Sequence, residues 1–451
     1  MDGKMRLGLF ALSEGHHVVS WRHPETLPGA GHRIEHYVEM AKTAERGCFD
    51  MLFQADSQST FGPDDPDIWK RTNYTDVFEP LTLASAMAMV TSRIGLVCTA
   101  SATYNDPYHV ARYFASIDMI SKGRAGWNLV TSSAASEALN FSFDAHVPHA
   151  ERYERAREFA EVVLGLWDSY DEDAFLGDKA SGLYFDPAKL HFLNHKGKHF
   201  KVRGPLTCMR SPQARPVMVQ AGQSEAGLEL AADTAEVLFS LTQDIVAARA
   251  FYADLKKRVV ARGRVAHSLL VMPGVLLVLG RTDREAREKF EQVQSLIHPE
   301  HGIAVLSDLL NVDLSRHDID GPLPDAPTTN TQQGRQQLLY AMARNENLSI
   351  REVYTRVVGG RGHRILCGTA KTAADSLEEW FATGACDGFN IMPLTFPGGL
   401  NEIVDELVPE LQRRGLFRTK YEGSTLRENL GLPWPVSRYA KAGVAVASEA
   451  R

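Results

Sequence analysis

A turn of small and polar residues, Gln220-Ala221-Gly222-Gln223-Ser224-Glu225-Ala226-Gly227, has the composition of an anion-binding site. The apolar run 216–219 leads into this turn, and a helical pattern from Leu228 to Asp233 leads out of it. The first amides of a helix have no partner within the helix, and the helix dipole favours negative charge there. Ser224 therefore marks either a phosphate-binding turn or an ordinary N-cap, and the spacing alone leaves both readings open.

His149 and Tyr153 form a second candidate pair, four residues apart at the start of an expected helix over 149–167. Residues with this spacing lie on one face of a helix, so the imidazole and the phenol could together bind a phosphate or the edge of a ring. The structural alternative is that Tyr153 begins the apolar stripe of the helix and His149 is solvated. Judged on spacing alone, the structural alternative is the more common case.

Several other catalytic patterns are absent from the sequence. It has no HExxH or other metal-ligand spacing, no GxGxxG and no P-loop, so we expect neither a metal site nor a built-in nicotinamide or ATP site. Ser224 misses the G-x-S-x-G elbow of hydrolases by one position. The net charge of −7, without blocks of like charge, argues against a nucleic-acid partner. Five scattered cysteines and the lack of a signal-like or transmembrane run predict a cytoplasmic protein that does not bind a membrane.

The secondary-structure elements that would position these residues appear in the sequence as a repeating pattern of apolar runs and helical stripes. The runs predict eight strands, at 6–12, 51–55, 94–99, 125–130, 216–221, 237–240, 269–279 and 388–392. Eight strands that alternate with helices predict an α/β fold, a (β/α)₈ TIM barrel. In such a barrel the carboxyl ends of the strands face the active site, a rule that selects Phe10, Asp56, Thr99, Asn128, Ser224 and Asn390.

Two segments, about 170–215 and about 298–368, break this repeat and are expected to be insertions within a single barrel domain that covers residues 1–451. The first contains an expected hairpin around Gly197, and the second is the candidate lid over the active site. Residues 415–451 are expected to form a C-terminal arm that packs on a neighbouring subunit. The sequence therefore predicts a homodimer or homotetramer.

Six motifs together resemble one family, the nitrilotriacetate monooxygenase and dibenzothiophene sulfone monooxygenase group of the bacterial-luciferase-like flavin-dependent monooxygenases. The motifs occupy 105–108, 123–132, 149–153, 221–227, 387–393 and 409–415, and the resemblance runs from about residue 5 to 432. It implies a barrel that binds FMN in its reduced form, FMNH2, supplied by a separate NAD(P)H:flavin reductase. It also implies that one oxygen atom from O2 is inserted into a small organic substrate, such as a xenobiotic or a sulfur- or nitrogen-containing compound.

The resemblance also implies which residues contact the flavin. The family's contacts fall on Asp56, Thr99, His149, Tyr153 and Ser224, with Thr103 and Asn128 as further contacts. In this interpretation Asp56, Thr99 and Asn128 hold the ring, and Ser224 and Tyr153 bind the phosphate. His149 would act as a proton donor or only as a binding group.

The sequence constrains the substrate less than the cofactor. Aromatic residues in loops of the expected active face favour an apolar or aromatic substrate; they are Phe10, Trp21, Phe53, Phe61, Trp69, Phe141 and Phe143. His16, His17 and Arg22 would instead suit an anionic substrate. An F420-dependent oxidoreductase of the same barrel superfamily and a non-catalytic flavin-binding protein are the remaining alternatives.

Overall fold

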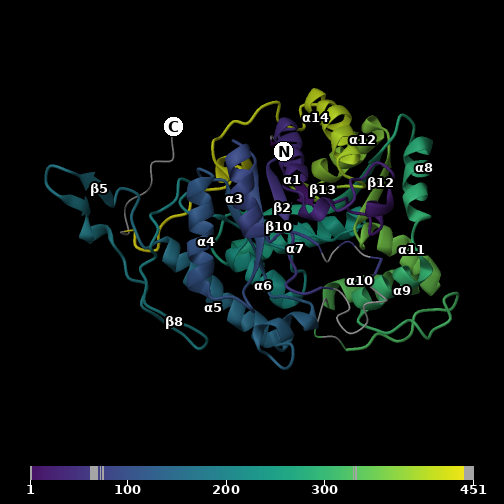
Figure 1. Ribbon diagram of the computed structural model, residues 1–451, viewed down its shortest axis with the longest axis horizontal. Coiled ribbons are helices and arrows are strands. Elements are labelled where there is room, and N and C mark those ends of the chain that lie inside the picture. Colours follow the sequence, from purple (N-terminus) through teal and green to yellow (C-terminus); the bar gives the residue numbers. More distant parts are fainter. Residues whose placement is uncertain are drawn as a thin grey trace.

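The computed structural model describes residues 3–60, 70, 71, 73, 76–328, 330 and 333–440. Its centre is a closed barrel of parallel strands with helices around it (Figure 1). The barrel strands are β1 (Arg6–Ala11), β2 (Met51–Gln54), β3 (Gly95–Ser101), β4 (Ala125–Val130), β9 (Val217–Gln220), β10 (Val237–Ser240), β11 (Leu270–Leu279) and β13 (Gly388–Pro393). They are neighbours in this order, and β13 pairs with β1 to close the barrel. The predicted TIM barrel and all eight predicted strands are therefore confirmed.

The barrel strands are apolar at nearly every position because both of their faces are covered. Successive side chains of a strand point to opposite faces. In β1, Leu9 joins the core between the barrel and its helices, whereas Phe10 joins the core inside the barrel. In β2, Leu52 and Phe53 divide between the two cores in the same way. This alternation determines which side chains can reach the mouth of the barrel.

Helices cover the outer face of the barrel and link its strands. They are α1 (Ile34–Arg46), α3 (Pro80–Val90), α4 (Pro107–Ile120), α5 (His149–Trp167), α6 (Glu225–Thr234), α7 (Ile245–Ala261), α8 (Asp283–Gln294), α12 (Ala370–Ala382), α13 (Gly398–Glu402) and α14 (Val408–Arg413). A π-helical turn, Ile403–Leu407, joins α13 to α14. Short 3₁₀ segments occur at Ser20–Arg22, Ala30–His32, Ala135–Phe141, Pro187–Lys189 and Ala266–Ser268. Residues from the first turns of α3, α5 and α6 line the cavity described below.

A ninth parallel strand, β12 (Arg364–Gly368), was not predicted. It pairs with 275–279 of β11, beyond the β11 residues 270–273 that pair with β10. Three helices precede it in the expected insertion, namely α9 (Pro299–Leu310), α10 (Gln333–Asn345) and α11 (Ile350–Gly360). Figure 1 shows these helices together on one side of the barrel.

The other expected insertion contains two small antiparallel sheets. One pairs β5 (Phe175–Asp178) with β6 (Leu183–Phe185), and the other pairs β7 (His195–Lys196) with β8 (Lys201–Val202). The second sheet confirms the hairpin predicted around Gly197. Both sheets project away from the barrel (Figure 1).

The C-terminal arm packs on the chain's own barrel, contrary to the expectation that it would pack on a neighbouring subunit. Its short helix α15 (Leu426–Leu430) lies at the amino ends of the strands, where Leu426 joins the core inside the barrel. Arg418 pairs with Asp50, and Arg427 pairs with Glu236 at 3.0 Å between Nη2 and Oε2. Since all four of these charged side chains are buried, the described part of the arm belongs to the barrel. Residues 441–451 of the predicted arm lie outside the described residues.

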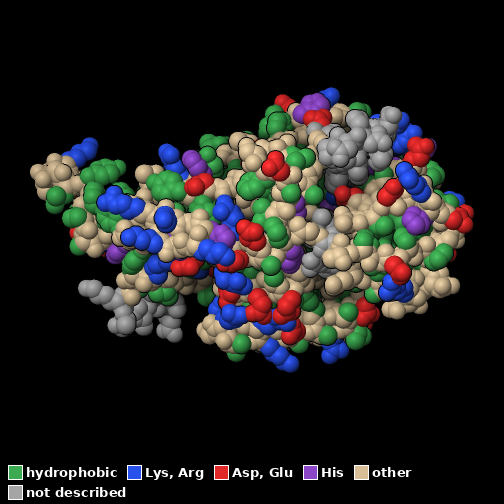
Figure 2. Space-filling model, turned by 90° about the horizontal axis from the view of Figure 1, so that it is seen from below, with side chains coloured by type: hydrophobic (Ala, Val, Ile, Leu, Met, Phe, Trp, Pro, Cys, Tyr) green, Lys and Arg blue, Asp and Glu red, His purple; other side chains and the backbone are tan. Residues whose placement is uncertain are grey.

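The surface carries charges of both signs. Figure 2 shows basic and acidic side chains interspersed on one face of the molecule. Ion pairs of partly or fully exposed side chains include Arg258 with Glu229 and Lys198 with Glu154. Within the described ranges, none of the helices has the length and apolar character needed to cross a membrane.

Candidate active site

A cavity of about 490 Å³ opens at the carboxyl ends of the barrel strands. All of the barrel strands except β11 contribute lining residues from these ends or from the loops that follow. The wall also includes residues from α1, from the starts of α3, α5 and α6, from α10 and from the α11–β12 connection. Its volume is in the range of pockets that bind small ligands and cofactors, and its position is the one where barrel enzymes have their active sites.

Six of the seven predicted contact residues line this cavity: Asp56, Thr99, Asn128, His149, Tyr153 and Ser224. Thr103 does not line it, because its buried hydroxyl donates to the Thr131 carbonyl oxygen at 2.8 Å. Asn390, selected as a strand-end residue, is also absent from the lining and is buried inside the barrel against Gly8. Asn390 is the third residue of β13, and Met392 is the residue of that strand that reaches the cavity.

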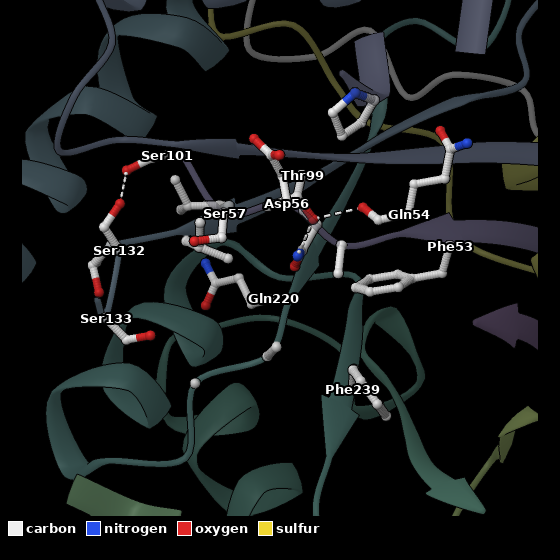
Figure 3. A pocket seen from close by; sticks show the side chains of 18 of the residues that line it. Phe53, Gln54, Asp56, Ser57, Thr99, Ser101, Ser132, Ser133, Gln220 and Phe239 are labelled. Carbon is white, nitrogen blue, oxygen red and sulfur yellow. Dashed lines mark hydrogen bonds between the residues drawn. The ribbon is translucent and has the colours of Figure 1, made fainter. Parts of the chain in front are cut away.

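Thr99 lies at the centre of a buried polar group on one wall of the cavity (Figure 3). Its hydroxyl donates to the Gln54 carbonyl oxygen at 2.7 Å and accepts from Asn128 Nδ2 at 2.8 Å. Asn128 Oδ1 and Gln54 Nε2 are buried without a hydrogen-bond partner in the described part of the chain. Buried polar atoms are almost always hydrogen-bonded, so Asn128 Oδ1 indicates a ligand with a hydrogen-bond donor at this wall. The Gln54 carboxamide lies instead beside Cys98 Sγ, which does not line the cavity.

Three phenylalanines form an apolar wall of the same cavity. The Phe10 and Phe53 rings pack edge to face at 5.1 Å between centroids, and Phe239 lies 5.4 Å from Phe10 and 5.5 Å from Phe53. In Figure 3, Phe53 and Phe239 lie on the side away from Ser101 and Ser132. The cavity therefore offers polar contacts on one side and an apolar aromatic surface on the other, which suits a flat heteroaromatic ring.

The turn before α6 forms a cradle at the edge of the cavity. Ser224 caps the helix by accepting from the Gly227 amide at 3.2 Å, which leaves its hydroxyl hydrogen able to donate to an anion. A Cβ atom on Gly222 would lie 3.1 Å from the Tyr153 hydroxyl, and one on Gly227 would lie 3.2 Å from it. These glycines therefore let the Tyr153 hydroxyl approach the start of the helix, where an anion is favoured.

Two further contacts fix this cradle. The Gln223 carboxamide oxygen accepts from the Leu241 amide at 2.8 Å, which ties the turn to the end of β10. The His149 ring lies 4.7 Å from the Tyr153 ring between centroids. Burial and the positive charge of Arg152 lower the pKa of His149, so its imidazole is neutral at pH 7 and can donate one hydrogen bond.

Two carboxylates also reach the cavity, and burial raises the pKa of each. Burial and the neighbouring Glu79 charge raise the pKa of Asp56 to about 6. Glu137 is held by Ser132, whose hydroxyl donates to it at 2.6 Å. Ser132 in turn contacts Ser101 at 2.7 Å between hydroxyl oxygens (Figure 3).

The raised pKa of Asp56 predicts that the stability difference between the wild type and Asp56→Asn depends on pH. Because the folded chain binds this proton more tightly than the unfolded chain, the Asp56 carboxylate destabilises the fold increasingly as the pH rises from about 4 to about 6. Asp56→Asn should therefore raise the free energy of unfolding of the flavin-free protein by about 1–3 kcal/mol at pH 7 and change it little at pH 4. Urea unfolding at pH 4, 5, 6 and 7 checks this, and a difference independent of pH would contradict it.

Sequence reasoning missed several residues of the site. Arg152 shares the face of α5 with His149 and Tyr153, so the helical spacing that selected those two could have found it. Phe239, Glu137, Arg335, Arg361 and His363 also line the cavity and carried no comparable signal. His16 and His17, which were named as suited to an anionic substrate, are fully buried and are not among the residues that line the cavity.

The predicted aromatic residues of the active face divide into several groups. Phe10 and Phe53 line the cavity, whereas Trp21 and Phe143 are exposed. Phe141 stacks on Tyr104 at 5.1 Å between centroids. Phe61 and Trp69 lie outside the described residues.

Comparison with known proteins gives a consistent result. The family model of luciferase-like monooxygenases matches residues 7–386. The chain is 49% identical to the N-acetyl-S-(2-succino)cysteine monooxygenase of Bacillus subtilis, over 97% of this chain and 99% of that protein. It is 49% identical to nitrilotriacetate monooxygenase component A of Aminobacter aminovorans, over 97% and 98% of the two chains. A crystal structure of a riboflavin lyase with modified FMN is similar with a TM-score of 0.87 at 30% identity, covering 97% of this chain and 98% of that one.

Proposed function

Because the chain belongs to the luciferase-like monooxygenase family, we propose that the cavity at the mouth of its barrel binds reduced FMN. The ring lies beside Asp56, Thr99 and Asn128, and the phosphate lies at the turn that begins α6, beside Ser224 and Tyr153. The observation that carries this proposal is the cradle at that turn, where two glycines and the Tyr153 hydroxyl leave room for an anion at a helix start.

The protein is a flavin-dependent monooxygenase that inserts one oxygen atom from O2 into a small organic substrate. When bound, reduced FMN supplies the two electrons with which the second oxygen atom is converted to water. The two similar monooxygenases are named after small organic acids, and the cavity volume of about 490 Å³ allows a substrate of that size. An F420-dependent oxidoreductase and a non-catalytic flavin binder are not favoured, because the similar proteins are named as monooxygenases.

The residues present fit this cofactor. Asn128 Oδ1, which has no partner among the described residues, offers a hydrogen-bond acceptor to the polar edge of the ring. Phe10, Phe53 and Phe239 exclude water from the other side, and exclusion of water protects reactive intermediates from side reactions. Ser224, Tyr153 and the first amides of α6 would bind the phosphate, and the neutral His149 imidazole would donate a hydrogen bond beside them.

We also propose that a separate NAD(P)H:flavin reductase supplies the reduced FMN. The chain carries no dinucleotide fingerprint, and the relative from Aminobacter aminovorans is named component A. The five free cysteines are consistent with the reducing cytoplasm, where NAD(P)H is available. A homodimer or homotetramer is supported by the apolar side chains exposed on the β5–β6 hairpin, namely Leu176, Leu183 and Tyr184.

Anaerobic titration with reduced FMN tests the cofactor site, with Ser224→Ala as the diagnostic variant. The substitution removes a hydroxyl donor to the phosphate and should weaken binding about 10- to 150-fold, since hydrogen bonds to charged groups contribute about 1.5–3 kcal/mol. The variant Thr282→Ala is a matched control, because Thr282 caps α8 in the same way, away from the cavity. Failure of the wild-type protein to bind reduced FMN, or equal affinity in Ser224→Ala, would contradict the proposed site.

A further inference from the structure

Two neighbouring helices on the outside of the barrel expose apolar side chains where the other helices expose charged ones. We propose that the outer face of α3 and α4 is the surface through which this chain binds a second copy of itself. This inference gives a position to the contact in the proposed homo-oligomer and does not depend on the cofactor site. The α3–α4 face is defined by its exposed residues, namely Thr82, Ala86, Met89, Val90, His109, Arg112, Tyr113, Ser116 and Ile120.

The exposed residues of each helix form one stripe. The helices α3 and α4 pack side by side (Figure 1). Their exposed positions are 82, 86, 89 and 90 in α3 and 109, 112, 113, 116 and 120 in α4. Spacings of three and four residues place side chains on one side of a helix. On the opposite side, Leu83 of α3 and Phe114 of α4 join the core between the barrel and its helices, so both stripes point away from the barrel.

Large apolar side chains dominate the α3–α4 face. Met89 is 75% exposed, and Tyr113 and Ile120 are 49% and 46% exposed. The Tyr113 ring stacks on His109 at 5.7 Å between centroids, a contact that holds the tyrosine in place on the surface. Contiguous exposed apolar side chains of this size are characteristic of interaction surfaces, and ordered tyrosines are frequent anchors in them.

The scarcity of charge separates this face from the rest of the outer surface. No residue of α3 is charged, and Arg112 is the only charged residue among the nine side chains of the face. The helices α1, α5, α6, α7, α8 and α12 each carry at least three charged residues; α6, with the fewest, has Glu225, Glu229 and Asp233. Interface cores are enriched in Met, Tyr and Arg and depleted of Lys, Glu and Asp, which is the composition of this face.

The same composition favours a second copy of the chain as the partner. Permanent homodimer interfaces are more apolar than those of proteins that associate and dissociate, such as a reductase that delivers flavin. Two-fold symmetry brings the same patch of both copies together. A face with large apolar side chains and a single charge is therefore complementary to itself.

The extent of the surface agrees with a dimer once the neighbouring hairpin is included. Two helices of 11 and 14 residues that lie side by side cover roughly 400 Å², whereas a stable interface buries about 800 Å² of each partner. The β5–β6 hairpin projects beyond the barrel on the side of α4 and exposes Leu176, Leu183 and Tyr184 (Figure 1). Since a two-stranded hairpin is only marginally stable in water, this one would be stabilised by packing on a second copy.

Sedimentation analysis of the full chain tests the surface. We expect the wild type to have at least twice the mass of one chain, and the double variant Met89→Lys with Ile120→Lys to have half the mass of the wild type at the same concentration. Two-fold symmetry would place these lysines in an apolar contact near like charges, which should weaken the association at least about 100-fold. The matched control is Val246→Lys with Val260→Lys on α7, where both valines are more than half exposed, and it should keep the wild-type mass.

Cysteine cross-linking is a second measurement that does not depend on added charge. Residues close to a two-fold axis meet their own copies across it. A short bismaleimide should therefore convert at least one of the variants Ala86→Cys, Met89→Cys and Tyr113→Cys into a covalent dimer, whereas Val260→Cys should stay a single chain. The wild type, whose own five cysteines are free, is the background control.

The outcomes distinguish this proposal from the proposed function. A wild type that is a single chain in solution, an oligomer that the two lysines leave intact, or the absence of a covalent dimer from all three cysteine variants would overturn the proposal. If the lysines leave the oligomer intact but lower reductase-dependent O2 consumption, the α3–α4 face binds the reductase instead. None of its nine residues lines the cavity, so reduced-FMN affinity should not change in these variants. Failure of the wild type to bind reduced FMN would overturn the cofactor site and leave this surface unaffected.

Discussion

Gly227→Val is expected to weaken the binding of reduced FMN by about 100-fold while the protein remains folded. A Cβ atom at this position would lie 3.1 Å from the Gly222 carbonyl carbon and 3.2 Å from the Tyr153 hydroxyl. The added methyl groups of valine would occupy the cradle and displace the Tyr153 hydroxyl from the helix start. Loss of one or two charge-assisted hydrogen bonds to the phosphate corresponds to about 3 kcal/mol, or about 100-fold in affinity.

Fluorescence titration under anaerobic conditions measures this effect. Ala226→Val is the matched control, because it places the same β-branched residue one position earlier in α6, outside the cavity lining. Gly227→Ala should give an intermediate loss of affinity, because its single methyl group meets the same Gly222 and Tyr153 atoms without the two further methyl groups of valine. A Gly227→Val variant that binds reduced FMN normally would place the phosphate elsewhere.

The strands of the barrel could be predicted because each is a short apolar run between polar or glycine-containing loops. The same property hid β12, because the run over 364–368 is no different in composition from a barrel strand. Whether such a run closes the barrel or pairs along β11 depends on three-dimensional packing. The expectation that Asn390 faces the active site was wrong for a related reason. The predicted end of its strand did not show which residue reaches the cavity.

The wall of the cavity that we assign to the cofactor could be predicted from the sequence, but the opposite end could not. Asp56, Thr99 and Ser224 stand at strand or helix ends, where the barrel rule and the turn composition both indicate a function. Arg335 and Arg361 belong to helices outside the eightfold repeat, where no periodicity relates a residue to the barrel axis. The C-terminal arm was misjudged because its two buried arginines look like surface residues in the sequence, and only their acidic partners in the barrel explain them.

One of these pairs, Glu236 with Arg427, is expected to have the largest effect on stability. Arg427 is 1% exposed and donates to both carboxylate oxygens of Glu236, which also accepts from the Met218 amide at 2.9 Å. Glu236→Ala would leave the buried guanidinium without its anion and the amide without its acceptor. Such truncations cost about 3–5 kcal/mol, so urea unfolding at pH 7 should show a loss of that size.

The pH dependence and a double variant make this prediction specific. Burial alone would raise the pKa of Glu236, but the charges of Arg427 and Arg215 outweigh it and hold the pKa below its usual value. A group whose pKa is lowered on folding stabilises the fold above its unfolded pKa and loses that contribution as the pH falls through the folded value. The difference between wild type and Glu236→Ala should therefore shrink below about pH 4.

The double variant Glu236→Leu with Arg427→Met should recover most of the lost stability, because a buried ion pair can often be replaced by apolar residues of similar volume. Reduced-FMN affinity measured where all variants are folded should stay unchanged, because the pair lies at the amino ends of the strands, away from the cavity. If the double variant is as unstable as Glu236→Ala, the arm stabilises the barrel through contacts other than this pair, such as Leu426. If the single variant loses less than about 1 kcal/mol, the charges are not buried in solution as the structure shows them.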